Sequence, residues 1–206
     1  MTSTVPTQTT MVVDYLKQFM FDPNHQHHDL LTKTQFVGSA DRNYNLKNSR
    51  TRKFLQWEEQ SFGINLGWTD NADPSTAVKV SRWFLTRQTS QQAPVRYGES
   101  IALGYGKAPS FIRYEERTFG INLGWSDSPV FEWKLLGGRT GQPVRSGDWL
   151  AIYNKRAGDC LIHFDRTAGG DVGWPSSQTW TDQLGDVLTK AVKEHWKEAV
   201  TFLLAS

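Results

Sequence analysis

The sequence has one cysteine, almost no net charge and no long apolar segment. Of its 206 residues, 23 are Lys or Arg and 21 are Asp or Glu, which gives a net charge of +2. The lone Cys160 cannot form an internal disulfide, so the fold does not require an oxidising compartment. The lack of any apolar run of membrane-spanning length predicts no integral membrane segment. Both charge signs are interspersed, which argues against a nucleic-acid partner.

The N-terminal residues lack the features of a secretory signal. Residues 1–10 are polar and rich in Ser and Thr, without a basic segment followed by an apolar one. We therefore expect a soluble protein that is cytoplasmic or released without a signal peptide. The length of the chain is within reach of a single compact core.

Recognisable catalytic and metal-binding groups are also scarce. Glu58-Glu59 and Glu115-Glu116 are adjacent acids, but neighbouring residues on a strand point to opposite faces, which argues against a glycosidase pair. The one His-rich cluster lacks helical spacing and is predicted to be a polar loop: Asp22, His25, His27, His28 and Asp29. We therefore predict no catalytic residues, no metal site and no cofactor.

What the sequence does contain is an internal repeat. Residues 54–70, FLQWEEQSFGINLGWTD, recur at 111–127 as FIRYEERTFGINLGWSD, and an eroded third copy covers 160–174. PVRYGE at 94–99 is matched in the same way by PVRSGD at 143–148. Repeats at this spacing predict three copies of one structural unit.

Each copy has the alternation of a strand pair. Leu55 and Trp57 share one face, and Ile64, Leu66 and Trp68 share a face of the returning segment. A glycine in the middle of each copy predicts a hairpin with a short loop. Because one short hairpin is unstable alone, three copies are expected to bury one another's apolar faces.

Three repeats of about four strands resemble a β-trefoil. The resemblance covers residues 36–206 and rests on repeat number, spacing and strand pattern. It implies an all-β fold, a barrel of six hairpins with threefold pseudosymmetry. The repeats are expected at about 36–92, 93–141 and 142–206, after a tail and short helix in residues 1–35. Trefoils include lectins, fascin-like actin-binding modules, protease inhibitors, growth factors and toxin domains.

A short helix is predicted near the N-terminus. Val12, Tyr15, Leu16 and Phe19 follow helical spacing after a capping residue, Thr10. The resemblance to a trefoil does not account for this segment.

A second helix is predicted within the third repeat. Apolar residues follow helical spacing between Leu184 and Trp196, so we expect an amphipathic helix over about 180–197. Residues 200–204 are predicted to be the closing strand of the barrel. The helices either cover the open end of the barrel or, alternatively, form a homodimer interface or a membrane-inserting element.

The repeated tryptophans allow two interpretations. Their strand phase matches that of Leu66, which favours a place in the core. If the indoles instead reach the rim, each ring lies beside amides and carboxylates, a usual composition for a sugar site. The predicted ligand-binding residues are then Asn65, Trp68, Asp70, Asn122, Trp125, Asp127, Asp171 and Trp174. Ser176 replaces the acid in the third copy, so its site is expected to be weaker.

The sequence therefore predicts a non-enzymatic binding protein, a multivalent lectin-like trefoil whose partners are glycans or a glycoprotein surface. Several weak sites on one rigid body gain avidity on clustered glycans. Two alternatives remain open. One is a toxin or defence protein whose trefoil docks a target while the added helix acts on a membrane or partner. The other is an actin- or protein-binding module.

Overall fold

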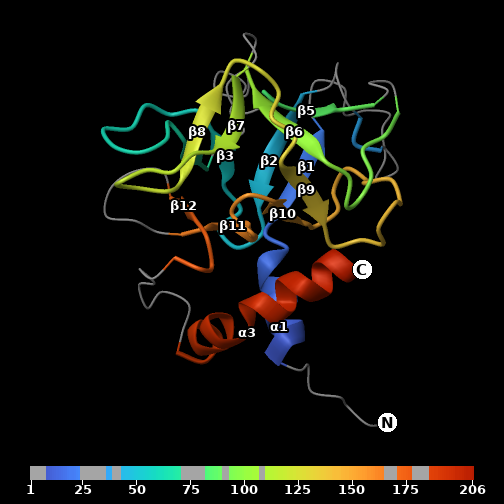
Figure 1. Ribbon diagram of the computed structural model, residues 1–206, viewed down its shortest axis with the longest axis vertical. Coiled ribbons are helices and arrows are strands. Elements are labelled where there is room, and N and C mark those ends of the chain that lie inside the picture. The colour runs from blue at the N-terminus through green and yellow to red at the C-terminus, as the bar shows by residue number, and fades with distance from the viewer. Residues whose placement is uncertain are drawn as a thin grey trace.

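The protein is mostly β-structure with two helices in the part of the chain that the structure describes (Figure 1). The structure, a computed structural model, describes residues 8–23, 36–38, 43–70, 82–89, 93–106, 110–164, 171–177 and 186–206. Twelve strands among these residues form one curled antiparallel sheet, a half-barrel, and the helices lie together below it in the view of Figure 1. The predicted β-rich class with two added helices is confirmed, whereas the β-trefoil remains a prediction.

The strands are short and follow one another along the chain. They are β1 (Phe19–Pro23), β2 (Tyr44–Asn48), β3 (Phe54–Gln56), β4 (Gly67–Thr69), β5 (Trp83–Arg87), β6 (Ile101–Tyr105), β7 (Ser110–Tyr114), β8 (Leu123–Ser126), β9 (Trp133–Leu136), β10 (Ala151–Asn154), β11 (Asp159–His163) and β12 (Val172–Gly173). The helices are α1 (Gln8–Leu16) and α3 (Asp186–Ala205).

The strand pairings repeat three times. β2 pairs with β3 and β3 with β4; the same order holds for β6, β7 and β8, and again for β10, β11 and β12. β5 joins β2 to β6, and β9 joins β6 to β10. All of these pairings are antiparallel, so the sequence repeat corresponds to a repeat in the sheet.

The strand that joins β10 to β2 comes from the N-terminal segment. β1 pairs with β2. It also bridges to the residue before β10, since the backbone N–H groups of Phe19 and Leu150 donate to each other's carbonyls at 2.9 and 2.8 Å. Residues 1–35 thus contribute a strand to the sheet as well as a helix. Phe19, predicted to lie on the helix, is the first residue of β1, because α1 ends at Leu16.

The predicted closing strand at 200–204 is wrong, because these residues lie in α3. Val192, Ala199, Val200 and Leu203 are all buried, and their spacing continues one helical stripe to the end of the chain. The helix therefore runs over Asp186–Ala205 rather than the predicted 180–197. β1 already pairs with β2 at the position for which this strand was expected.

The two helices cover a face of the sheet rather than the open end of a barrel. α1 and α3 share a buried cluster with Leu136, Ala151, Cys160 and Ile162 of β9, β10 and β11. Ile152 belongs instead to the main core, as strand alternation requires. The apolar stripe of α3 is thus buried within the chain. None of the described helices has the length and apolar character needed to cross a membrane.

Cys160 is fully buried beneath the helices, as predicted for a small apolar residue. Burial raises the pKa of its thiol well above the ordinary value. Phe54 and Phe111 stand at this position in the other copies, where no described helix covers the strand. The smaller side chain lets the helices approach β11, which accounts for one difference of the third copy.

Equivalent hydrogen bonds recur inside the main core. The indole N–H of the fully buried Trp83 donates to the Leu55 carbonyl at 2.6 Å, and that of Trp133 donates to the Ile112 carbonyl at 2.7 Å. Leu55 and Ile112 are equivalent residues of the first two copies. The two copies therefore share internal polar contacts as well as an apolar pattern.

A ring of three backbone hydrogen bonds links the three repeats. Val37 N–H donates to Val144, Val144 N–H donates to Val95, and Val95 N–H donates to Val37, each at 2.8 Å. All three valines are fully buried. The three segments around Val37, Val95 and Val144 are thus joined in one closed hydrogen-bonded ring.

Candidate binding surface

Two equivalent loops connect the hairpin strands of the first two copies. Residues 57–66 join β3 to β4, and residues 115–122 join β7 to β8. The predicted short turns are therefore wrong. The loops fold on themselves because Asn65 Oδ1 accepts the Gln60 N–H, and Asn122 Oδ1 accepts the Arg117 N–H, both at 3.1 Å.

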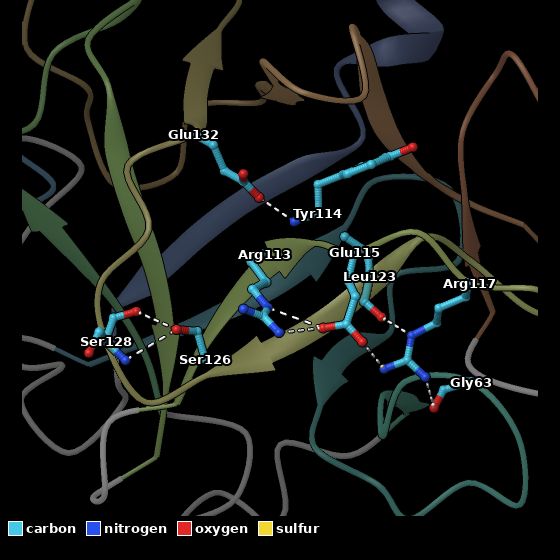
Figure 2. Close-up of polar contacts among 9 residues, drawn as sticks. All are labelled: Gly63, Arg113, Tyr114, Glu115, Arg117, Leu123, Ser126, Ser128 and Glu132. Atoms are coloured by element: carbon cyan, nitrogen blue, oxygen red, sulfur yellow. Dashed lines mark hydrogen bonds and ion pairs between the residues drawn. The ribbon is translucent and has the colours of Figure 1, made fainter.

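A second repeated hydrogen bond closes each loop. Gln60 Nε2 donates to the Leu66 carbonyl at 3.0 Å, and Arg117 Nε donates to the Leu123 carbonyl at 2.6 Å (Figure 2). Asn65 and Asn122, predicted to contact a sugar, thus use their side-chain carbonyls within their own loops.

The glycine of each Gly-Trp pair makes room for a carboxylate. A Cβ atom on Gly67 would lie 1.8 Å from Glu58 Oε2, and one on Gly124 would lie 2.4 Å from Glu115 Oε2. Either contact would force the acid to move. The repeated glycine therefore has a packing role that the strand pattern did not reveal.

The repeated tryptophans pack inward. Trp174 is buried and stacks on Trp133 with ring centroids 6.3 Å apart. Trp68 is half-buried, lies 5.2 Å from the His163 ring and donates from its indole to the Asp171 carbonyl at 2.9 Å. Trp125 is half-buried against the same core. These contacts support the core interpretation.

The predicted rim acids lie apart from the loop amides. Asp70 is exposed after β4 and forms an ion pair with Lys53 at 3.4 Å. Asp127 is exposed after β8. Asn65 and Asn122 precede the same strands, so each amide and each acid lie at opposite ends of a strand. The structure does not bring them into one cluster, and the half-buried Asp171 lies directly before β12.

The most exposed large apolar side chains of the described chain lie on these two loops. Phe62 is 68 % exposed and Phe119 is 80 % exposed. They occupy the same position in the two copies, directly before a glycine. Neither ring has a ring contact or an internal partner among the described residues. Neither was predicted as a site residue, although their identity in both copies was a visible signal.

The tips of the two loops touch. Gly63 and Gly120 have left-handed φ values of 84° and 86°. A Cβ atom on Gly120 would lie only 3.3 Å from the Cα of Gly63. Arg117 Nη1 also donates to the Gly63 carbonyl at 3.4 Å (Figure 2). The teal and yellow-green loops accordingly protrude side by side at the left of Figure 1.

The charges on the two loops are unequal. In the second loop, Glu115 lies between Arg113, at 2.7 Å, and Arg117, at 3.5 Å (Figure 2). Exposed acids with no ion pair among the described residues lie on both loops: Glu58, Glu59 and Glu116. We call the two loops together, with Phe62, Phe119 and these acids, the paired-loop surface.

No protein-family model matches the chain, and a search of curated proteins finds no relative. The contacts of the described residues are therefore the basis for the functional proposal.

Two buried acids, Asp159 and Glu132, accept hydrogen bonds inside the protein. Asp159 accepts the backbone N–H groups of Cys160 and Ser176 at 2.7 and 2.8 Å, and burial raises the pKa of its carboxyl to about 6. Glu132 accepts the Tyr114 N–H (Figure 2). It also accepts the Asn154 amide at 3.0 Å. No cluster of three metal-ligating side chains occurs in the described ranges, and the His-rich cluster lies outside them except for Asp22.

Proposed function

We propose that the protein is a non-enzymatic, lectin-like β-trefoil that binds carbohydrate on its paired-loop surface. The trefoil is supported by the threefold strand pairings and by the valine ring that links the repeats. In this proposal β1 supplies the twelfth strand of the barrel from the N-terminal side. The sequence had assigned that strand to residues 200–204.

The observation that carries the function is an exposed phenylalanine at the same place in both loops. Several other residues identical in the two copies have internal contacts: Asn65 closes its loop, Gly67 leaves room for an acid, and Ile64 and Leu66 are buried. The exposed Phe62 ring has no ring contact among the described residues. A repeated exposed aromatic without an internal partner is typical of a binding residue.

Carbohydrate is the ligand class that fits both components of the surface. An aromatic face stacks on the apolar face of a pyranose ring, and carboxylates accept hydrogen bonds from its hydroxyl groups. Phe62 and Phe119 supply the aromatic faces. Glu59 and Glu116, three residues before them, supply free carboxylates.

The strand-end acids are the competing location for the same function. Asp70 and Asp127 are exposed and accessible. Their neighbouring indoles, however, are packed against the core, so the aromatic half of a sugar site is missing there. This difference favours the loops over the Gly-Trp strands.

A glycan array with matched variants tests the proposal. Wild-type protein is expected to bind a defined set of glycans, and Phe62→Ala/Phe119→Ala is expected to lose them. Because both rings are exposed, the unfolding temperature should stay within a few degrees of wild type. Asp70→Ala/Asp127→Ala is the control and should keep the wild-type pattern. Binding that survives the phenylalanine changes but not the aspartate changes would assign the site to the strand ends. An empty array would refute the proposed function.

A further inference from the structure

We infer that the two loops form one composite site for an amino-bearing oligosaccharide, rather than two equivalent sites for single sugars. This inference rests on the proposed function and specifies its ligand. It differs from the multivalency that the sequence repeat predicts. Three properties of the paired-loop surface support it: the distance between the loop tips, the free aromatic faces and the charge.

The two phenylalanines are held close together. The contact between Gly63 and Gly120 joins the residues that directly follow them. With 3.8 Å between consecutive Cα atoms, the Cα atoms of Phe62 and Phe119 lie at most about 12 Å apart. Such a spacing lies within the reach of one short oligosaccharide. A ligand bound at one ring would also obstruct a second ligand at the other.

Both aromatic faces are available to one ligand. Phe62 and Phe119 do not stack on each other or on another described ring. Their loops are fixed by internal hydrogen bonds and by the contact of Arg117 with Gly63. The surface is thus preorganised, which reduces the entropy lost on binding. Consecutive sugar rings of one chain are expected to cover the two phenylalanines.

The free charge on this surface is negative. Glu58, Glu59 and Glu116 have no ion pair among the described residues. Glu115 pairs with the guanidinium groups of both Arg113 and Arg117 and offsets only one of their charges, so the excess of negative charge comes from the remaining acids outnumbering the second arginine. Complementarity therefore favours a ligand with protonated amino groups and disfavours sialylated, sulfated or uronic glycans.

The third copy does not add an equivalent site in this account. Its sequence has Ala168 where the other copies have Phe62 and Phe119. A ligand that needs two aromatic faces is therefore served by the first and second copies alone. The expected stoichiometry is one oligosaccharide per chain.

Titration calorimetry with three probes tests the inference. The probes are the trisaccharide of glucosamine, the trisaccharide of N-acetylglucosamine and sialyllactose, at about pH 6, where Glu side chains are ionised. We expect one glucosamine trisaccharide per chain, bound on the order of tenfold more tightly than the N-acetylated form, since each exposed charge pair contributes modestly. Sialyllactose is expected to bind most weakly.

Substitutions on the two loops distinguish one composite site from two separate sites. Phe62→Ala and Phe119→Ala should each weaken the glucosamine trisaccharide at least about tenfold, because both rings contact the same ligand. Glu59→Gln/Glu116→Gln should remove most of the preference for the amino form while keeping the fold. Glu194→Gln, an exposed change on α3, is the matched control and should leave the preference intact.

Failure of the composite site, failure of the charge preference and failure of the proposed function give different results. Two trisaccharides per chain, or a single variant that halves the stoichiometry without changing the affinity, would overturn the composite site. Equal or tighter binding of sialyllactose, or no binding of the glucosamine probe, would overturn the charge preference. If the array of neutral glycans is positive in these cases, the proposed function stands and only the composite amino-sugar site is lost.

Discussion

Substitution of three buried tryptophans by phenylalanine tests the hydrogen bonds that the first two copies share. Trp83 and Trp133 are fully buried, and each indole N–H donates to a carbonyl of the equivalent strand. Trp174 is also buried, but its Nε1 has no partner among the described residues. Trp174→Phe therefore makes a similar truncation without breaking a hydrogen bond.

The expected difference follows from the polar groups that are left behind. Trp83→Phe and Trp133→Phe each deprive a buried carbonyl of its indole donor, at a cost of about 1–3 kcal/mol beyond the lost packing. Trp174→Phe removes a buried unpaired donor and so recovers part of its packing loss. We expect the first two variants to be less stable than the third by about 2–4 kcal/mol. For a chain of this size that is about 5–15 °C in unfolding temperature.

Urea unfolding followed by far-ultraviolet circular dichroism measures this difference without relying on the altered fluorophores. The two bonded variants should lose stability to a similar extent, since they occupy equivalent positions. Equal losses in all three variants would show that ring packing alone stabilises these sites. A loss in Trp83→Phe far from that in Trp133→Phe would refute the equivalence of the two copies.

Three further changes probe the acid, the helices and β1. The pKa of Asp159 is raised from 3.8 to about 6, so between these pH values the folded chain binds more protons than the unfolded chain. The Asp159 carboxyl therefore makes the free energy of unfolding fall as pH rises through that window. Urea titrations from about pH 4 to pH 6 should show this slope, and Asp159→Asn should flatten it; an unchanged slope would assign it to other groups. Val192→Ala, at a fully buried position of α3, should lower the free energy of unfolding by about 1.5–3 kcal/mol. Phe202→Ser, at an exposed position of the same helix, should change it by less than about 0.5 kcal/mol. Equal losses in the two variants would contradict the observed orientation of the helix. Phe19→Ala in β1 should cost about 3–5 kcal/mol in the same assay, and a loss below about 1 kcal/mol would show that the strand is dispensable.

The sequence predicted the repeat and the strand-rich class because both depend on local alternation. The pairing of β1 with β2 could not be predicted from the sequence, because the pairing of Phe19 with Asn48 joins residues that no repeat relates. The C-terminal residues were assigned to a strand by analogy with the other copies. Their helix follows from the stripe through Val200 and Leu203, which is buried against β9–β11 and α1.

The site that we propose has the composition predicted from the sequence, an aromatic ring beside polar groups, but it lies on the two loops instead of the Gly-Trp strands. An aromatic beside polar groups was sought at Trp68 and Trp125, whose strand phase also supported a place in the core. Burial distinguishes a tryptophan in the core from one at the rim, and burial depends on tertiary packing that the alternation of apolar residues does not specify. Phe62 and Phe119 lie in loops whose conformation is set by side-chain hydrogen bonds, so the strand pattern carried no information about their exposure.

The central claim is that one carbohydrate occupies both loops, and nuclear magnetic resonance of carbon-13-labelled phenylalanine rings tests it most directly. The glucosamine trisaccharide would be titrated into the labelled protein, with signals assigned through Phe62→Leu and Phe119→Leu. The account predicts that both ring signals shift together along one binding curve, while the buried Phe19 and Phe21 stay unchanged. Two curves of different affinity, or shifts confined to residues beside Asp70 and Asp127, would contradict it.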